Sequence, residues 1–170
     1  FELALNRSQY INKNQKVNDQ FIADSGYGQG QILMNPLQLA SIYSAFVNNG
    51  SIYRPHLVEQ GEQMWIQRVF SDKTVKTIKE DLINVIADEK GTGHSIYHDN
   101  VTLAGKTGTA EIKQSQSDTT GTELGWFTVM TTDEKQPILM TTVVEDVKNR
   151  GGSGYVVEHT KTPLDLYLSK

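Results

Sequence analysis

The chain has 170 residues, 37% of them apolar and 21% charged, and its net charge is −4. This length fits one domain or a large part of one, and the absence of a basic cluster excludes a typical nucleic-acid binder. The absence of cysteine excludes disulfide scaffolds, Cys-zinc sites and thiol nucleophiles, and no apolar run approaches the roughly 18 residues of a membrane helix.

The N-terminal part predicts a polar segment, a glycine turn and a helix. Residues 1–20 are rich in Asn and Gln and predict a solvated lead-in. The glycine cluster at 26–30 predicts a turn or a close backbone approach. A helix is predicted over 36–49, because Asn35 can cap its start and Gly50 suits the position just past its end.

A second helix follows a stretch of short extended pieces. Residues 52–69 alternate loosely around a proline and a glycine, which predicts short strands about a turn. Ser71 can cap a helix predicted over 72–90, which has an apolar stripe and is followed by Gly91 and Gly93.

The C-terminal half predicts an antiparallel sheet and one more helical segment. Strand-like runs span 101–112, 125–131 and 138–144. The polar stretch 113–123 is long enough for a flap, and 132–137 reads as a tight hairpin. An amphipathic helix is predicted over 155–168, kinked or split at Pro163 with Thr162 capping the second piece. Helices segregated from a meander indicate an α+β domain.

The sharpest chemical signal is Lys106-Thr107-Gly108-Thr109, set in the first strand-like run. A strand edge offers backbone N–H groups to an oxyanion, and Gly108 leaves room for a ligand backbone. Lys106 adds a positive charge and Thr107 a hydroxyl. This inventory suits acyl transfer, in which donors must already face the developing negative charge.

Several stretches together resemble the penicillin-binding proteins, whose K-T-G box accompanies S-x-x-K and S-x-N motifs. The similarity is strongest to the class B members, and within them to the low-affinity type. It covers about residues 22–170 and is carried, in family order, by K-T-G at 106–108 and by Gly26–Gly30, Asn35–Ala40, Asn48–Gly50, Arg54–Val58, Gly91–Gly93 and Gly125–Phe127.

One departure from the family pattern is decisive for activity. No S-x-x-K and no S-x-N occurs in the 170 residues. The resemblance therefore implies that residues 1–170 are the C-terminal portion of one transpeptidase domain, with the nucleophile-bearing half absent. Covalent catalysis needs an activated nucleophile within reach of its base, so the chain alone is expected to be inactive.

The resemblance also implies roles for single residues. The backbone N–H of Thr109 would be an oxyanion donor, and Lys106 would attract the carboxylate of a stem peptide or a β-lactam. Thr107 and Thr109 hydroxyls would bond that carboxylate, and Gly108 would line the same site. Trp126 and Phe127, on the neighbouring strand, are expected to be core residues.

The family further implies where the parent protein works and what it meets. It would be a serine-type D,D-transpeptidase on the outer face of the bacterial cytoplasmic membrane, cross-linking peptidoglycan stem peptides, binding β-lactams and needing no metal or organic cofactor. The missing half of the domain is an expected partner. An exposed core face, with Leu39, Tyr43, Phe46 and 138–144, would favour self-association.

Two other functions stay open at the level of sequence. One is a β-lactam-sensing module of the same superfamily that does not cross-link peptide. The other is an unrelated α+β binding domain with a chance K-T-G, which fails if 106–109 line a groove at the edge of a three-stranded antiparallel sheet. His94 and His98 have a spacing that a metal site could use, but no third ligand is obvious. The glycine loop 151–154 could bind an anion, but its composition favours a plain turn.

Overall fold

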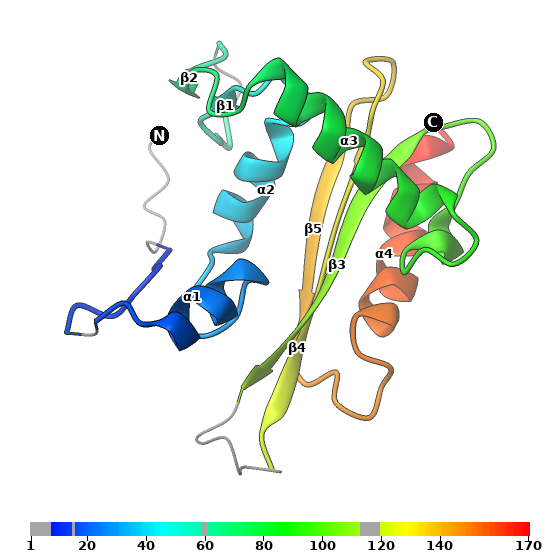
Figure 1. Cartoon of the computed structure of the whole chain (residues 1–170). Coiled ribbons are helices and arrows are strands. Elements are labelled where there is room, and N and C mark those ends of the chain that lie inside the picture. Colours follow the sequence, from blue (N-terminus) through cyan, green and yellow to red (C-terminus); the bar gives the residue numbers. More distant parts are fainter. Residues whose placement is uncertain (1–7, 15, 59–60, 113–119) are drawn as a thin grey trace.

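The computed structural model of the chain describes residues 8–14, 16–58, 61–112 and 120–170. Its centre is a three-stranded antiparallel sheet in the order β3 (Leu103–Ile112), β4 (Thr122–Thr131) and β5 (Leu139–Val144). The helices α1 (Asp19–Gly26) and α2 (Pro36–Ser44) lie on one side of this sheet, and α4 (Ser153–Leu168) lies on the other (Figure 1). The sequence-based α+β assignment is confirmed.

Two buried clusters hold the helices on the sheet. The larger one joins α3 (Asp72–Ala87), the short 3-10 turn η1 (His94–Ile96) and α4 to the sheet. Its fully buried side chains include Ile86, Ile96, Phe127, Val129, Val147, Val156 and Leu164. The smaller cluster packs Phe46 and Leu82 against Ala104 and Met130. Burial of this apolar surface is the main stabilising contribution to the fold.

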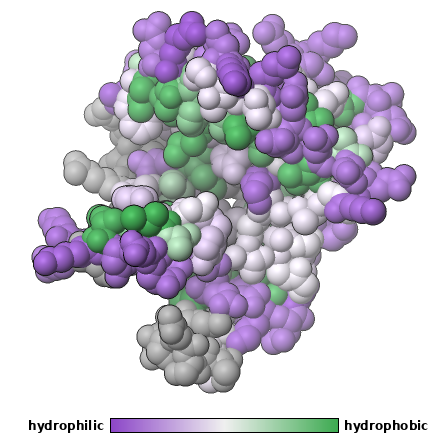
Figure 2. All heavy atoms as spheres, viewed as in Figure 1, coloured by the Kyte–Doolittle hydropathy of each residue, from purple (hydrophilic) through white to green (hydrophobic). Residues whose placement is uncertain are grey.

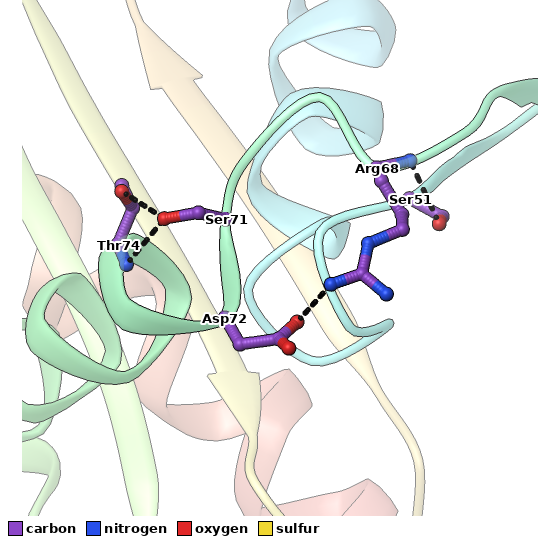
Figure 3. Close-up of polar contacts among 5 residues, drawn as sticks. All are labelled: Ser51, Arg68, Ser71, Asp72 and Thr74. Carbon is purple, nitrogen blue, oxygen red and sulfur yellow. Dashed lines mark hydrogen bonds and ion pairs between the residues drawn. The ribbon is translucent and has the colours of Figure 1, made fainter.

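The predicted starts of α2 and α3 are confirmed, and the reason is local capping; α4 starts at Ser153, two residues before its predicted start, without a side-chain cap. The Asn35 side chain accepts a hydrogen bond from the Leu37 N–H at 2.9 Å, and the Ser71 hydroxyl accepts one from Thr74 at 3.2 Å. Figure 3 shows the start of α3, where Arg68 also pairs with Asp72 at 2.9 Å. Each cap satisfies an N–H group that the first helical turn cannot.

The predicted ends of the first two helices are too late, whereas α4 ends at Leu168 as predicted. The helix predicted over 36–49 ends at Ser44, because residues 45–47 donate to carbonyls three residues back and form tight turns. The helix predicted over 72–90 ends at Ala87, since the Asp88 carboxylate accepts from the Lys90 N–H. Such local side-chain bonds compete with helix continuation.

The last helix is continuous, so the predicted split at Pro163, with Thr162 capping a second piece, is wrong. α4 runs from Ser153 to Leu168 with Pro163 inside it. A proline in a helix interior costs about 3 kcal/mol. The fully buried Val156, Val157 and Leu164 lie on both sides of this position, and their packing on the sheet outweighs the lost backbone bond.

The N-terminal segment is more structured than the predicted solvated lead-in. Asn18 caps α1, which begins at Asp19 within residues 1–20 and buries Phe21. Gln9 forms a bridge with Leu33, which ties this segment to the glycine-rich turn. The side chain of Asn18 and the acidic first turn were the signals for this helix.

The extended elements follow the prediction with shifted bounds. The strands predicted over 101–112, 125–131 and 138–144 become β3, β4 and β5, and β4 starts three residues earlier than expected. Within residues 52–69, where short strands were predicted, the chain forms the short pair β1 (Ile52–Tyr53) and β2 (Met64–Ile66). Most of the predicted flap lies outside the described residues.

Exposed apolar side chains gather away from the expected face. Phe46 is 9% exposed, while Leu57, Val58, Met64, Trp65 and Ile66 around β1 and β2 are all at least 42% exposed. Figure 2 shows apolar side chains in this region and a second group over α1. Of the expected patch, Phe46 belongs to the chain's own core, while Leu39, Tyr43 and residues 138–144 are half-buried.

Candidate active site

The K-T-G box lies in the middle of an edge strand. Residues 106–109 pair with 125–128 of β4, and among the described residues no strand pairs with the other edge of β3. The exposed edge of a strand presents backbone donors and acceptors that a ligand can use. The backbone around Lys106 is therefore open to a ligand along this edge.

A cleft opens along this strand. It has a volume of about 680 Å3 and runs between the sheet face of β3 and β4 and the segment that leads from α1 into α2. Lys106, Thr107, Gly108 and Thr109 line the sheet side together with Trp126 and Thr128. Apolar and aromatic side chains line the opposite wall: Tyr27, Ile32, Leu33, Met34, Leu39 and Tyr43.

Alternation along β3 divides the box between two faces. Lys106 is exposed, and its ammonium group donates to the Thr107 carbonyl oxygen at 2.7 Å. A Cβ added at Gly108 would meet nothing closer than the Trp126 Cβ at 3.7 Å, so this position leaves space in front of the strand. The cationic group and the open backbone thus lie side by side on the cleft.

The two threonine hydroxyls bond to other parts of the chain. Thr107 is only 8% exposed, and its hydroxyl lies 2.8 Å from the hydroxyl of Thr92. The Thr109 hydroxyl accepts a hydrogen bond from the Ser153 N–H at 3.2 Å. Thr109 is exposed, so its hydroxyl can still donate its own hydrogen to a ligand.

The neighbouring strand shows the same alternation. Phe127 is fully buried, as expected for a core residue. Trp126 is half-buried and lines the cleft, so it faces the site and not the core behind the sheet. The expectation that both residues belong to the core is therefore wrong for Trp126. It rested on apolar composition alone, whereas neighbouring residues in a strand point to opposite faces.

Two tyrosines of the opposite wall were not expected at the site from the sequence. The Tyr27 hydroxyl donates to the Asp24 carboxylate at 2.9 Å, and this bond raises the pKa of Tyr27. Burial raises the pKa of Tyr43. Since both shifts go upward from about 10, both phenols stay protonated near neutral pH and can donate but not act as bases.

The histidine pair is not brought together as a metal site. His94 bonds the Ile86 carbonyl oxygen at 2.9 Å, and His98 bonds the Asp165 carboxylate at 3.0 Å. Within the described ranges there is no group of three metal-ligating side chains. The same ranges hold no helix that is long and apolar enough to cross a membrane.

The fold, the edge-strand K-T-G box and its cleft together point to one family of domains. Residues 1–162 match the penicillin binding protein transpeptidase domain. The chain belongs to this family, and its predicted class B resemblance is confirmed.

Relatives in the family are similar over most of this chain. Penicillin-binding protein 3 of Bacillus subtilis is 39% identical over 95% of the chain and 24% of its own length. The peptidoglycan D,D-transpeptidase MrdA of Haemophilus influenzae is 26% identical over 85% of the chain and 25% of its own length. The chain thus spans about a quarter of these relatives.

Solved structures share the fold. The transpeptidase domain of penicillin-binding protein 3 from Burkholderia pseudomallei has a TM-score of 0.64 at 21% identity, covering 91% of this chain and 48% of that one. PBPA from Mycobacterium tuberculosis has a TM-score of 0.67 at 19% identity, covering 90% of this chain and 35% of that one.

Proposed function

We propose that this chain is the C-terminal portion of a peptidoglycan D,D-transpeptidase domain that works through a serine acyl-enzyme and binds β-lactams. The placement of the K-T-G box on an open strand edge, lining a cleft, carries this proposal. The family match and its D,D-transpeptidase member support it. A chance K-T-G in an unrelated domain would have no reason to occupy this position.

The proposed chemistry divides between this chain and a serine outside it. The serine hydroxyl attacks the carbonyl between the two terminal D-Ala residues of a stem peptide, loses its proton to a base and forms an acyl-enzyme as D-Ala leaves. The amine of a neighbouring stem peptide then attacks the ester and releases the serine. A β-lactam would form the first ester by ring opening and trap it.

This chain would supply binding and electrostatic stabilisation. The Thr109 N–H would donate to the developing oxyanion, and the Lys106 ammonium group would attract the ligand carboxylate. The Thr109 hydroxyl can donate to the same carboxylate while it accepts from Ser153. Thr107 and Gly108 would line the ligand through their backbone, since the Thr107 side chain is buried.

The chain itself contains neither S-x-x-K nor S-x-N, so we propose that it is inactive alone. In the complete protein it would act on the outer face of the bacterial cytoplasmic membrane, where its substrate lies. The low-affinity character stays a prediction, measured by the rate at which the complete protein reacts with penicillins.

The test is covalent labelling of the complete protein by a fluorescent penicillin, followed by a cross-linking assay with stem peptides. Labelling together with cross-linking is expected. Labelling without cross-linking would favour a β-lactam sensor over a transpeptidase. Absence of labelling, with the serine motifs present, would overturn the proposal.

A further inference from the structure

The rear face of the K-T-G strand is held at three successive positions. A Cβ added at Gly105 would lie 2.9 Å from the Ile86 Cδ1 atom, so α3 packs directly on the backbone there. Two residues on, Thr107 contacts Thr92, and after two more, Thr109 contacts the Ser153 N–H at the start of α4. Gly105, Thr107 and Thr109 share one face because side chains alternate along a strand.

The loop that carries Thr92 is itself fixed to the end of α3. The Gly93 N–H donates to the Val85 carbonyl oxygen at 3.0 Å, and the Gly91 N–H donates to Asp88 at 2.8 Å. A Cβ added at Gly91 would lie 2.3 Å from the Val85 carbonyl oxygen, closer than real atoms approach. The two glycines therefore bring the Thr92 backbone against the helix.

We propose that Thr92 is a positioning residue for the K-T-G strand in acyl transfer. This inference rests on the proposed transpeptidase function. The hydroxyl of Thr92 meets the hydroxyl of Thr107 behind the strand, directly beside Lys106 and one residue from Gly108. Thr92 is not among the residues that line the cleft; it fixes the strand that carries the charge and the oxyanion donor.

The contact controls a geometry on which catalysis depends steeply. Loss of one neutral hydrogen bond is a small effect, whereas misplacement of reacting groups by about 1 Å can slow a reaction about 10²-fold. The other two rear contacts limit the displacement. Thr92→Val, which keeps the shape and removes the hydroxyl, is expected to slow acylation about tenfold.

The experiment measures the second-order rate of acylation by a fluorescent penicillin in the complete transpeptidase. Thr92→Ser retains a hydroxyl and should restore the rate to within about twofold of the original protein. Thr74→Val is the matched control. It removes a contact of 2.9 Å between the hydroxyls of Thr74 and Ser71 at the start of α3, whereas the loop of Thr92 follows the end of α3 (Figure 3). Its rate should be unchanged.

A double variant separates positioning from general destabilisation. If Thr92 acts through Thr107, Thr92→Val should have little further effect on the acylation rate in a Thr107→Val background. If Thr92→Val only destabilised the fold, its effect on the acylation rate would multiply with that of Thr107→Val. Thr92→Ser would then not restore the rate. Rates are compared per correctly folded protein, from the circular dichroism of each variant.

The outcomes distinguish this inference from the function beneath it. An unchanged rate in Thr92→Val, with an original protein that is acylated, overturns the positioning role alone. A multiplicative effect in the double variant also overturns it. An original protein with intact serine motifs that is never acylated overturns the proposed transpeptidase function.

Discussion

At Gly125 the side chains of α4 and of the loop before it pack directly on the backbone of β4, and substitution of Gly125 tests this packing. A Cβ added there would lie 2.4 Å from the Val156 Cγ2 atom and 2.9 Å from the Val147 Cγ1 atom. Both valines are fully buried, so neither can move its side chain into solvent. Gly125→Ala must therefore displace α4 or the loop before it.

Overpacking of this kind costs about 1–3 kcal/mol. We expect a cost of about 2 kcal/mol for Gly125→Ala, which corresponds to a melting temperature lower by about 2–4 °C in a domain roughly twice as long as this chain. The assay is thermal denaturation of the transpeptidase domain that contains this chain, followed by circular dichroism. The added Val156→Ala should restore part of the loss, because it removes the methyl group in conflict.

Gly108→Ala is the matched control on the neighbouring strand. Its added Cβ would meet the Trp126 Cβ at 3.7 Å, an ordinary contact, so the melting temperature should not fall. The packing argument is refuted if Gly125→Ala melts within 1 °C of the original protein. It is also refuted if Val156→Ala adds its full separate cost to that of Gly125→Ala.

Three further outcomes concern the site and the isolated chain. Lys106→Ala in the complete enzyme should slow acylation by penicillin about 10²–10³-fold, because one preorganised charge is lost; an unchanged rate would refute its role. The chain alone should gain no mass after incubation with penicillin, since it lacks the nucleophile, and a stoichiometric adduct in intact-mass measurement would contradict this. The chain alone should also self-associate in light scattering, whereas a monodisperse monomer that binds no hydrophobic dye would show a completed core.

Local signals explain the parts of the fold that the sequence predicted. The caps at Asn35 and Ser71 act over two or three residues, so composition alone places the starts of α2 and α3. The three strands were found because alternation and turn residues repeat along the chain. The continuity of α4 through Pro163 depends on packing against the sheet, which no local pattern encodes.

The site, too, has one part that the local sequence predicts and another that only the folded structure shows. The K-T-G box is contiguous, and its chemistry could be read from four neighbouring residues. Thr92 is 15 residues from Thr107, and Ser153 is 44 residues from Thr109, so their contacts needed the folded structure. The glycines around Thr92 and before Ser153 were visible as motifs, but their purpose was not.

The two edges of the sheet differ in a way that locates the expected self-association. Within the described residues, β3 and β5 each pair on one side only. The exposed Lys106 on β3 discourages pairing with another chain, since a charge on an edge strand opposes aggregation. β5 reads Leu-Met-Thr-Thr-Val-Val, carries no charge and is half-buried throughout. Association of the isolated chain should therefore use β5, which leaves the K-T-G edge open for its ligand.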